Sequence, residues 1–100
     1  MAVIELHTFR LADADGEQPF VAADARAQTE FAYQQRGLLR RTTARAAQGE
    51  WLVVTLWASQ HDAESAEAAA RRHPAAQAVS AMIDSASASM RRYKIGRAHV

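Results

Sequence analysis

The sequence contains no cysteine, only two prolines and four glycines, and few aromatic residues. Without cysteine the chain has no disulfide framework, no thiolate zinc site and no cysteine nucleophile. The glycines stand singly, so neither a glycine-rich phosphate loop nor a Gly-x-Ser-x-Gly nucleophile elbow is present. The longest apolar run, residues 51–58, is far shorter than the roughly 20 residues that span a bilayer. These absences argue against a nucleotide-binding protein, a serine hydrolase and a membrane protein.

The sequence also lacks an excess of either positive or negative charge. Twelve Lys and Arg residues stand against 11 Asp and Glu residues, for a formal net charge of +1. This balance argues against a dedicated polyanion binder, so no nucleic acid partner is expected. We expect the arginines to form a solvated rim or to pair with Asp13, Asp15 and Glu17 of a neighbouring molecule. Polar residues near the N-terminus, such as Glu5 and Arg10, interrupt any signal-peptide pattern and predict a cytoplasmic protein.

Large apolar side chains are few for a chain of 100 residues. Hydrophobic residues make up 49%, but alanine supplies 24 of them and buries only a methyl group. A small domain with so few large side chains has a marginal core when it is alone. A second copy of the chain is therefore expected to complete the core, as a homodimer.

Hydrophobic periodicity predicts a single domain over residues 1–95 and a flexible tail over residues 96–100. Strands are predicted over residues 3–11, 39–46, 51–59 and 90–95, and helices over residues 18–36, 59–72 and 74–83. The order is β-α-β-β-α-β with the second helix broken at Pro74. This order predicts a ferredoxin-like α+β fold, in which helices cover one face of an antiparallel sheet.

Local signals mark several boundaries of these elements. Gly37 is predicted to form a left-handed C-terminal cap of the first helix. Ser59, with Asp62 three residues later, predicts the start of the second helix. Residues 48–49 supply a hairpin turn, and residues 85–89 are predicted to form a loop of small side chains.

Alternation along the strands predicts two apolar sheet faces. One face is aliphatic, with Ile4 and Leu6 on the first strand, and the other mixes aromatic residues with Glu5 and His7. The predicted helices cover only one of these faces, and an uncovered apolar face requires another partner. The same face of a second subunit is the simplest cover.

The run Leu52-Val-Val-Thr-Leu-Trp57-Ala-Ser59-Gln-His-Asp62-Ala63 resembles the antibiotic biosynthesis monooxygenase (ABM) family of dimeric α/β barrels. In that family a strand ends in Trp and is followed by a small residue, Ser, acidic residues and a helix. The likeness covers residues 3–95 and extends to Phe9-Arg10-Leu11, to the helix that contains Phe31, and to Gly37-Leu38.

The resemblance implies a homodimer whose two sheets form a barrel, with a small hydrophobic cavity between sheet and helices in each subunit. Members include cofactor-independent oxygenases of polycyclic phenols and quinols, and haem-degrading enzymes. The haem-degrading pattern requires an Asn on the first strand, and this chain has no Asn; it also requires a Trp where residues 66–70 stand. The resemblance therefore favours a monooxygenase that acts on an aromatic or quinol-like metabolite without a cofactor.

His7 is the candidate catalytic residue. Imidazole titrates near neutral pH and is able to take a proton from a phenol, whose anion supplies electrons to dioxygen more readily. The alternative interpretation is a histidine held by Glu5 or by a backbone carbonyl at the dimer interface. Glu5 and His7 are also two possible metal ligands, but neither His61 nor His73 is fixed as a third, so no metal is expected.

Five aromatic residues are candidates for binding the substrate: Trp51, Trp57, Tyr93, Phe9 and Tyr33. Trp51 and Trp57 share a strand face, where they wall a cavity for a flat ligand or pack at a subunit interface. The tyrosine hydroxyls orient a polar substrate or lie at the edge of a packed ring. Two other functions stay open, a non-catalytic dimer that binds a small hydrophobic ligand and a ligand-sensing module, because one fold hosts many functions.

Overall fold

The computed structural model describes residues 1–97 and contains one four-stranded sheet and three α-helices. The elements follow the chain as β1 (Val3–Phe9), α1 (Glu17–Glu30), η1 (Ala32–Gln34), β2 (Leu38–Arg45), β3 (Trp51–Trp57), α2 (Gln60–Ala70), α3 (Pro74–Ala81), η2 (Ser85–Ser87) and β4 (Ser89–Lys94), where η marks a 3₁₀ helix. The strand order is β2-β3-β1-β4, and every neighbouring pair is antiparallel. The predicted ferredoxin-like fold is confirmed.

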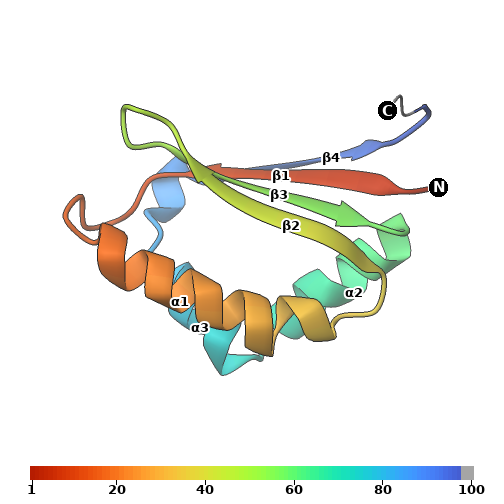
Figure 1. Cartoon of the computed structure of the whole chain (residues 1–100), viewed down its shortest axis with the longest axis horizontal. Coiled ribbons are helices and arrows are strands. Elements are labelled where there is room, and N and C mark those ends of the chain that lie inside the picture. Colours follow the sequence, from red (N-terminus) through yellow and green to blue (C-terminus); the bar gives the residue numbers. More distant parts are fainter. Residues whose placement is uncertain (98–100) are drawn as a thin grey trace.

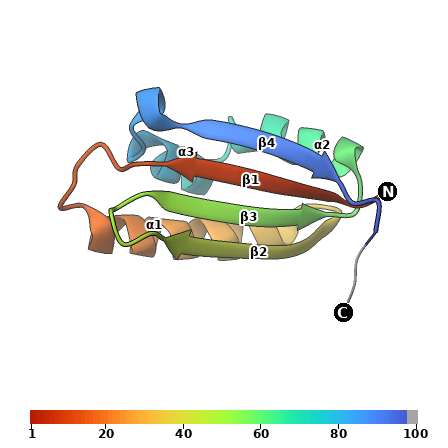
Figure 2. The same cartoon turned by 90° about the horizontal axis from the view of Figure 1, so that it is seen from above.

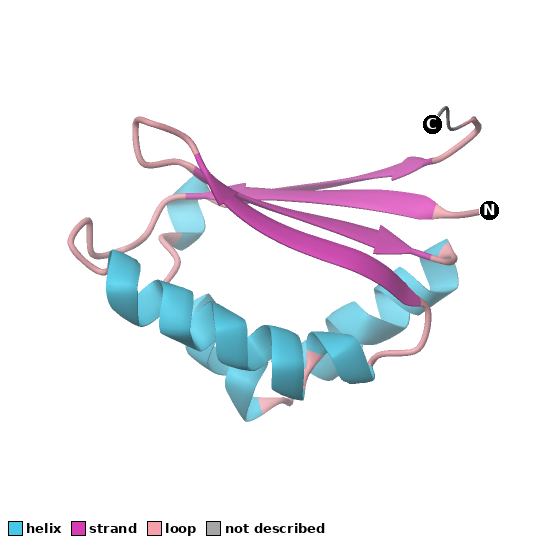
Figure 3. Ribbon diagram, in the orientation of Figure 1, coloured by secondary structure: helices cyan, strands magenta, loops and turns pink. Residues whose placement is uncertain are grey.

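All three α-helices lie on the same side of the sheet (Figures 1 and 3). Seen from above, α1 runs under β2 and β3, whereas α3 lies near β1 and β4 and α2 is visible beyond the outer edge of β4 (Figure 2). The break between α2 and α3 occurs before Pro74, as predicted, and the imidazole of His73 caps α3 by accepting from the Ala75 N–H. The opposite face of the sheet, called the open face below, carries none of the described helices.

The first helix is shorter than the sequence predicts. It ends at Glu30 rather than at residue 36, and η1 leads from there toward β2. Gly37 does adopt a left-handed φ of 83°, but it lies beyond η1 and does not cap α1. A Cβ atom at this position would overlap the Asp62 carboxylate, so glycine is needed for the close approach of α2.

Smaller differences occur at three other boundaries. Strand β1 ends at Phe9, because Leu11 pairs only in an isolated bridge with Ile83. The predicted small-residue loop contains η2, and its last residue, Ser89, already belongs to β4. Ser59 caps α2 as predicted and accepts from the Asp62 N–H at 3.1 Å. Of the predicted tail, residues 98–100 lie outside the described residues.

The helices cover one of the two sheet faces that alternation predicts and leave the other uncovered. The helices cover the mixed face, where Phe20 of α1 is fully buried against Phe9 and Trp51, at ring-centroid distances of 5.6 and 4.8 Å. A second cluster joins Trp57 to Ala63 and Ala66 of α2. The aliphatic side chains of the open face are half-buried: Ile4, Leu6, Leu52, Val54 and Leu56.

Candidate active site

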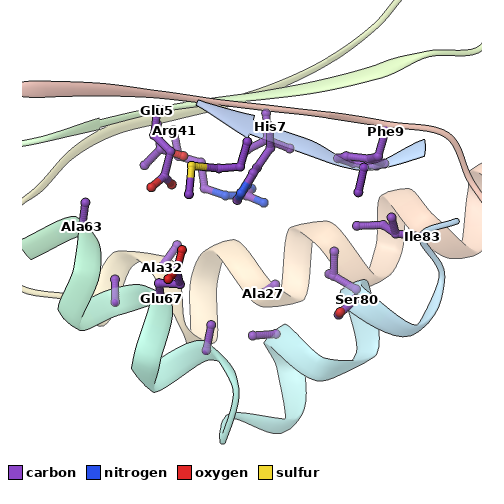
Figure 4. Close-up of a pocket in the computed structure, with 18 of the residues that line it drawn as sticks. Glu5, His7, Phe9, Ala27, Ala32, Arg41, Ala63, Glu67, Ser80 and Ile83 are labelled. Carbon is purple, nitrogen blue, oxygen red and sulfur yellow. The ribbon is translucent and has the colours of Figure 1, made fainter. Parts of the chain in front are cut away.

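A cavity of about 480 Å³ lies between the mixed face of the sheet and the helices (Figure 4). The helices contribute mostly alanine to its walls: Ala27, Ala32, Ala63, Ala66, Ala70 and Ala76. Because a methyl group fills little of the space between two layers, the high alanine content leaves room for a ligand. The volume is within the usual range of small-molecule sites, roughly 300–1,000 Å³.

One end of the cavity is polar because of the strand register. Glu5 on β1 lies between Arg92 on β4 and Thr55 on β3, and Thr55 in turn lies beside Arg41 on β2. These four side chains therefore form a row across the helix-covered face, and each lines the cavity. In Figure 4, Glu5, Arg41 and His7 are grouped toward one end and Phe9 with Ile83 toward the other.

Glu5 is buried but fully partnered. Its Oε2 accepts from Arg92 Nε at 2.7 Å, and its Oε1 accepts from Trp57 Nε1 at 3.4 Å. Arg92 Nη2 also donates to Glu67 of α2 at 3.0 Å, which ties β4 to the helix layer. Glu5 is only 7% exposed, and the ion pair with Arg92 on the neighbouring strand offsets the cost of burying its carboxylate.

Asp24 and Glu67 belong to this polar network but were not identified from the sequence. Asp24 is buried, and its carboxylate accepts from Arg41 Nη2 at 2.6 Å and from the Thr43 hydroxyl at 2.7 Å. Asp24 lies four residues after Phe20, on the helix face that packs against the sheet. A carboxylate on the buried face of a helix requires a buried partner. The position of Asp24 four residues after Phe20 could therefore have identified it from the sequence.

The arginines are not a simple solvated rim. Arg41 and Arg92 point inward, and the side chain of Arg41 is only 12% exposed. Arg45 pairs with Glu17 at 3.1 Å within the same chain, whereas the sequence predicted either a solvated arginine or a pair with Glu17 of a neighbouring molecule. β2 runs back along α1, so that its last residue, Arg45, lies near the start of α1, where Glu17 is (Figure 1).

His7 lies beside the polar row, opposite Val53 and Met90, and its imidazole is accessible from the cavity. The part of the chain that the structure describes shows no hydrogen bond to this ring, and Glu5 is engaged by Arg92 and Trp57 instead. Desolvation by the surrounding atoms lowers the pKa of His7 below its ordinary 6.5, although the nearby Glu5 carboxylate opposes the shift. The side chain is nevertheless exposed, so the lowered pKa favours the neutral imidazole, whose lone pair is accessible from the cavity.

The structure brings some of the predicted binding residues to the cavity and not others. Phe9 and Trp57 line it together with His7. Trp51 is buried against Phe20 in the core and does not line the cavity. Tyr33 is 58% exposed on η1, and its hydroxyl accepts from Gln28. Tyr93 lies on the open face at 45% exposure and is not a lining residue.

The described residues were also searched for groups of metal ligands and for membrane-spanning helices. Within residues 1–97, no group of three or more His, Asp or Glu side chains is placed to hold a metal ion. In the same range, no helix combines the length and the apolar character that a membrane span requires.

Similar proteins were sought at the level of sequence and of structure. No protein-family model matches the sequence, and no curated protein does. Among solved structures, SnoaB, a cofactor-independent oxygenase from Streptomyces nogalater, superposes with a TM-score of 0.76 at 21% identity, covering 97% of this chain and 95% of SnoaB. A candidate antibiotic biosynthesis monooxygenase from Bordetella bronchiseptica superposes with a TM-score of 0.79 at 14% identity, covering 94% and 96%.

A third similar structure is a candidate antibiotic biosynthesis monooxygenase from Caulobacter crescentus CB15, with a TM-score of 0.75 at 12% identity. It covers 96% of this chain and 91% of its own. Likeness over nearly the whole chain at such identities establishes architecture and leaves activity open. The resemblance predicted from the sequence is thus confirmed for the architecture: this chain has the fold of the antibiotic biosynthesis monooxygenases.

Proposed function

We propose that this protein is a small-molecule enzyme of the cofactor-independent monooxygenase type, which acts on an aromatic or quinol-like metabolite with His7 as base. One observation carries the proposal: the exposed imidazole of His7, without a hydrogen-bond partner among the described residues, opens into a largely apolar cavity. SnoaB, which has the same fold, is a cofactor-independent oxygenase, and this supports the same reaction class.

The proposed chemistry begins with proton transfer. His7 takes an acidic proton from the substrate, and the resulting anion reduces dioxygen more readily than the neutral molecule does. For a ring CH₂ group activated by phenolic rings, one oxygen atom becomes a carbonyl and the other leaves as water. Both hydrogens of that water come from the CH₂ group, so atoms and electrons balance. Glu5 and Glu67 each act to raise the pKa of His7 and so favour the imidazolium that forms.

The walls of the cavity suit a flat substrate. Phe9, Phe31 and Trp57 supply aromatic surface, and the alanine-lined helices leave a slot beneath the sheet. The unit that we propose to be active is a homodimer joined through the open face, whose half-buried aliphatic residues need a cover. The single domain over residues 1–95 and the cytoplasmic location stay predictions.

Oxygen uptake with a panel of polycyclic phenols and quinols tests the proposal. We expect uptake with at least one compound and a loss of about 100-fold or more in His7→Ala, the usual contribution of a general base. Because only neutral His7 accepts the proton, the wild-type rate should fall on acidification at a pH below 6.5. His61→Ala is the matched control, since His61 is exposed on α2 and does not line the cavity.

Two results would contradict the proposal. An unchanged rate in His7→Ala would remove this residue as the base. Binding of the same compounds without oxygen uptake would favour the non-catalytic ligand-binding protein instead.

A further inference from the structure

The cavity opens to solvent beside β4, an edge strand of the sheet. Its lining residues on α1, β2 and β3 are buried or half-buried, whereas the exposed ones lie on β1, α2, α3 and the segment from η2 into β4. These exposed residues are called the mouth below: His7, Glu67, Ser80, Ser85, Ala88 and Ser89. A ligand therefore reaches the cavity between β4 and the helices α2 and α3.

One ion pair joins the two sides of the mouth at the polar end of the cavity. Arg92 of β4 donates from Nη2 to Glu67 Oε1 of α2 at 3.0 Å. Within residues 1–97, no other hydrogen bond links β4 to an α-helix. In Figure 4, Glu67 lies on α2 across the cavity from Glu5. The width of the mouth at this end therefore depends on the contact between Arg92 and Glu67.

Both members of this pair have a second partner. Arg92 Nε donates to Glu5 of the neighbouring strand at 2.7 Å. Glu67 Oε2 lies 3.5 Å from Nη2 of Arg71, one turn further along α2. The side chains of Glu67 and Arg71 are 43% and 73% exposed, so Glu67 has room to turn away from β4. When the pair breaks, neither charge is left without compensation, and opening costs little free energy.

We propose that the Arg92–Glu67 pair is a gate at the mouth: a ligand passes when Glu67 leaves Arg92 and pairs with Arg71 alone, and the gate then closes behind it. The inference goes beyond the proposed function, because any compound that fills the cavity must pass the mouth, whether or not it reacts. A gate of this kind changes the rates at which a ligand enters and leaves.

The absence of cysteine from the chain allows a single introduced thiol to measure this passage. Ala27→Cys places a thiol on α1 at the buried wall of the cavity, and Ala32→Cys on η1 is a second reporter at a buried wall position. The probe is N-phenylmaleimide, a flat aromatic reagent, and the mass of the intact protein gives the rate of thiol modification.

Two substitutions should change this rate in opposite directions. Glu67→Ala removes the closed state, so we expect modification to be about threefold faster or more. Arg71→Ala removes the second partner of Glu67, so we expect modification to be about twofold slower, the size of effect typical of an exposed pair one turn apart. A general loosening of the fold would accelerate modification in both variants, so the slower rate in Arg71→Ala is specific to the gate.

Glu64→Ala is the control for the lost charge, because Glu64 is exposed on the same helix and does not line the cavity; its rate should equal that of the parent protein. Ala25→Cys, exposed on α1, should react at the same rate in all variants. An unchanged rate in Glu67→Ala, or a faster rate in Arg71→Ala, would overturn the gate. The assay needs no substrate, so this failure would leave the proposed enzyme standing, and an absence of oxygen uptake would leave the gate standing.

Discussion

At the scale of single residues, the buried ion pair of Asp24 and Arg41 joins the helix layer to the sheet. Their side chains are only 11% and 12% exposed, and Thr43 donates a further hydrogen bond to the same carboxylate. A buried ion pair adds little net stability compared with apolar residues, but loss of one partner leaves the other charge without compensation. Asp24 is thus important for keeping Arg41 in place at the cavity wall.

Asp24→Ala should lower the free energy of unfolding by about 3 kcal/mol or more, because it leaves a buried guanidinium unpaired. Urea denaturation measures this change. Glu30→Ala removes the exposed partner of Arg26 on the same helix and should cost less than about 0.5 kcal/mol. Equal losses in the two variants would show that Asp24 is not specifically coupled to Arg41.

The sequence predicted part of the candidate site. His7, Phe9 and Trp57 were expected at a pocket and do line the cavity, because alternation along a strand places them on the same face. Tyr33 and Tyr93 were chosen for their hydroxyl groups, but the structure places them outside the cavity. Alternation orders residues within a strand, whereas the face that the helices cover depends on packing.

At the scale of elements, the approach of α2 to the segment before β2 depends on Gly37. Its φ of 83° is strained for any residue with a side chain, and a Cβ atom would overlap Asp62 in the first turn of α2. The Ala58 N–H also donates to the Gly37 carbonyl at 2.7 Å, which holds the end of β3 against this segment. The left-handed conformation was predicted correctly, but its role was not, because a close approach between distant segments leaves no mark in local sequence.

Gly37→Ala should lower the free energy of unfolding by about 1–3 kcal/mol, from backbone strain and from displacement of Asp62. Thermal or urea unfolding measures the change. Gly96→Ala is the control, because a Cβ atom there has no neighbour within 4 Å, and its stability should stay near that of the wild type. A Gly37→Ala variant as stable as the Gly96→Ala variant would contradict the close-approach argument.

At the scale of the whole molecule, the open face of the sheet determines the expected assembly. Five aliphatic residues of β1 and β3 are half-buried there, and none of the described helices covers them. With so many alanines among the apolar residues, the chain has little other surface with which to complete a core. We therefore expect a homodimer that buries this face.

Sedimentation equilibrium should detect a dimer of the 11.0 kDa chain in the wild type and a shift to monomer in Val54→Asp. A carboxylate at the centre of the open face would be desolvated without a partner on dimerisation. Val21→Asp is the control, because Val21 is 50% exposed on α1, away from the open face, and should leave the dimer intact. A stable, well-folded wild-type monomer at low concentration would contradict the dimer.

The sequence by itself determined the order of elements, the two apolar faces of the sheet and the place of His7 on the mixed one. These properties follow from local periodicity and from the conformational limits of proline and glycine, so they can be recognised without a partner segment. The tertiary structure alone decided which face the helices cover, and it alone paired Asp24 with Arg41 and placed Glu67 beside Arg92. Such pairings join residues far apart in the chain, and their register depends on how the helices and the sheet pack together.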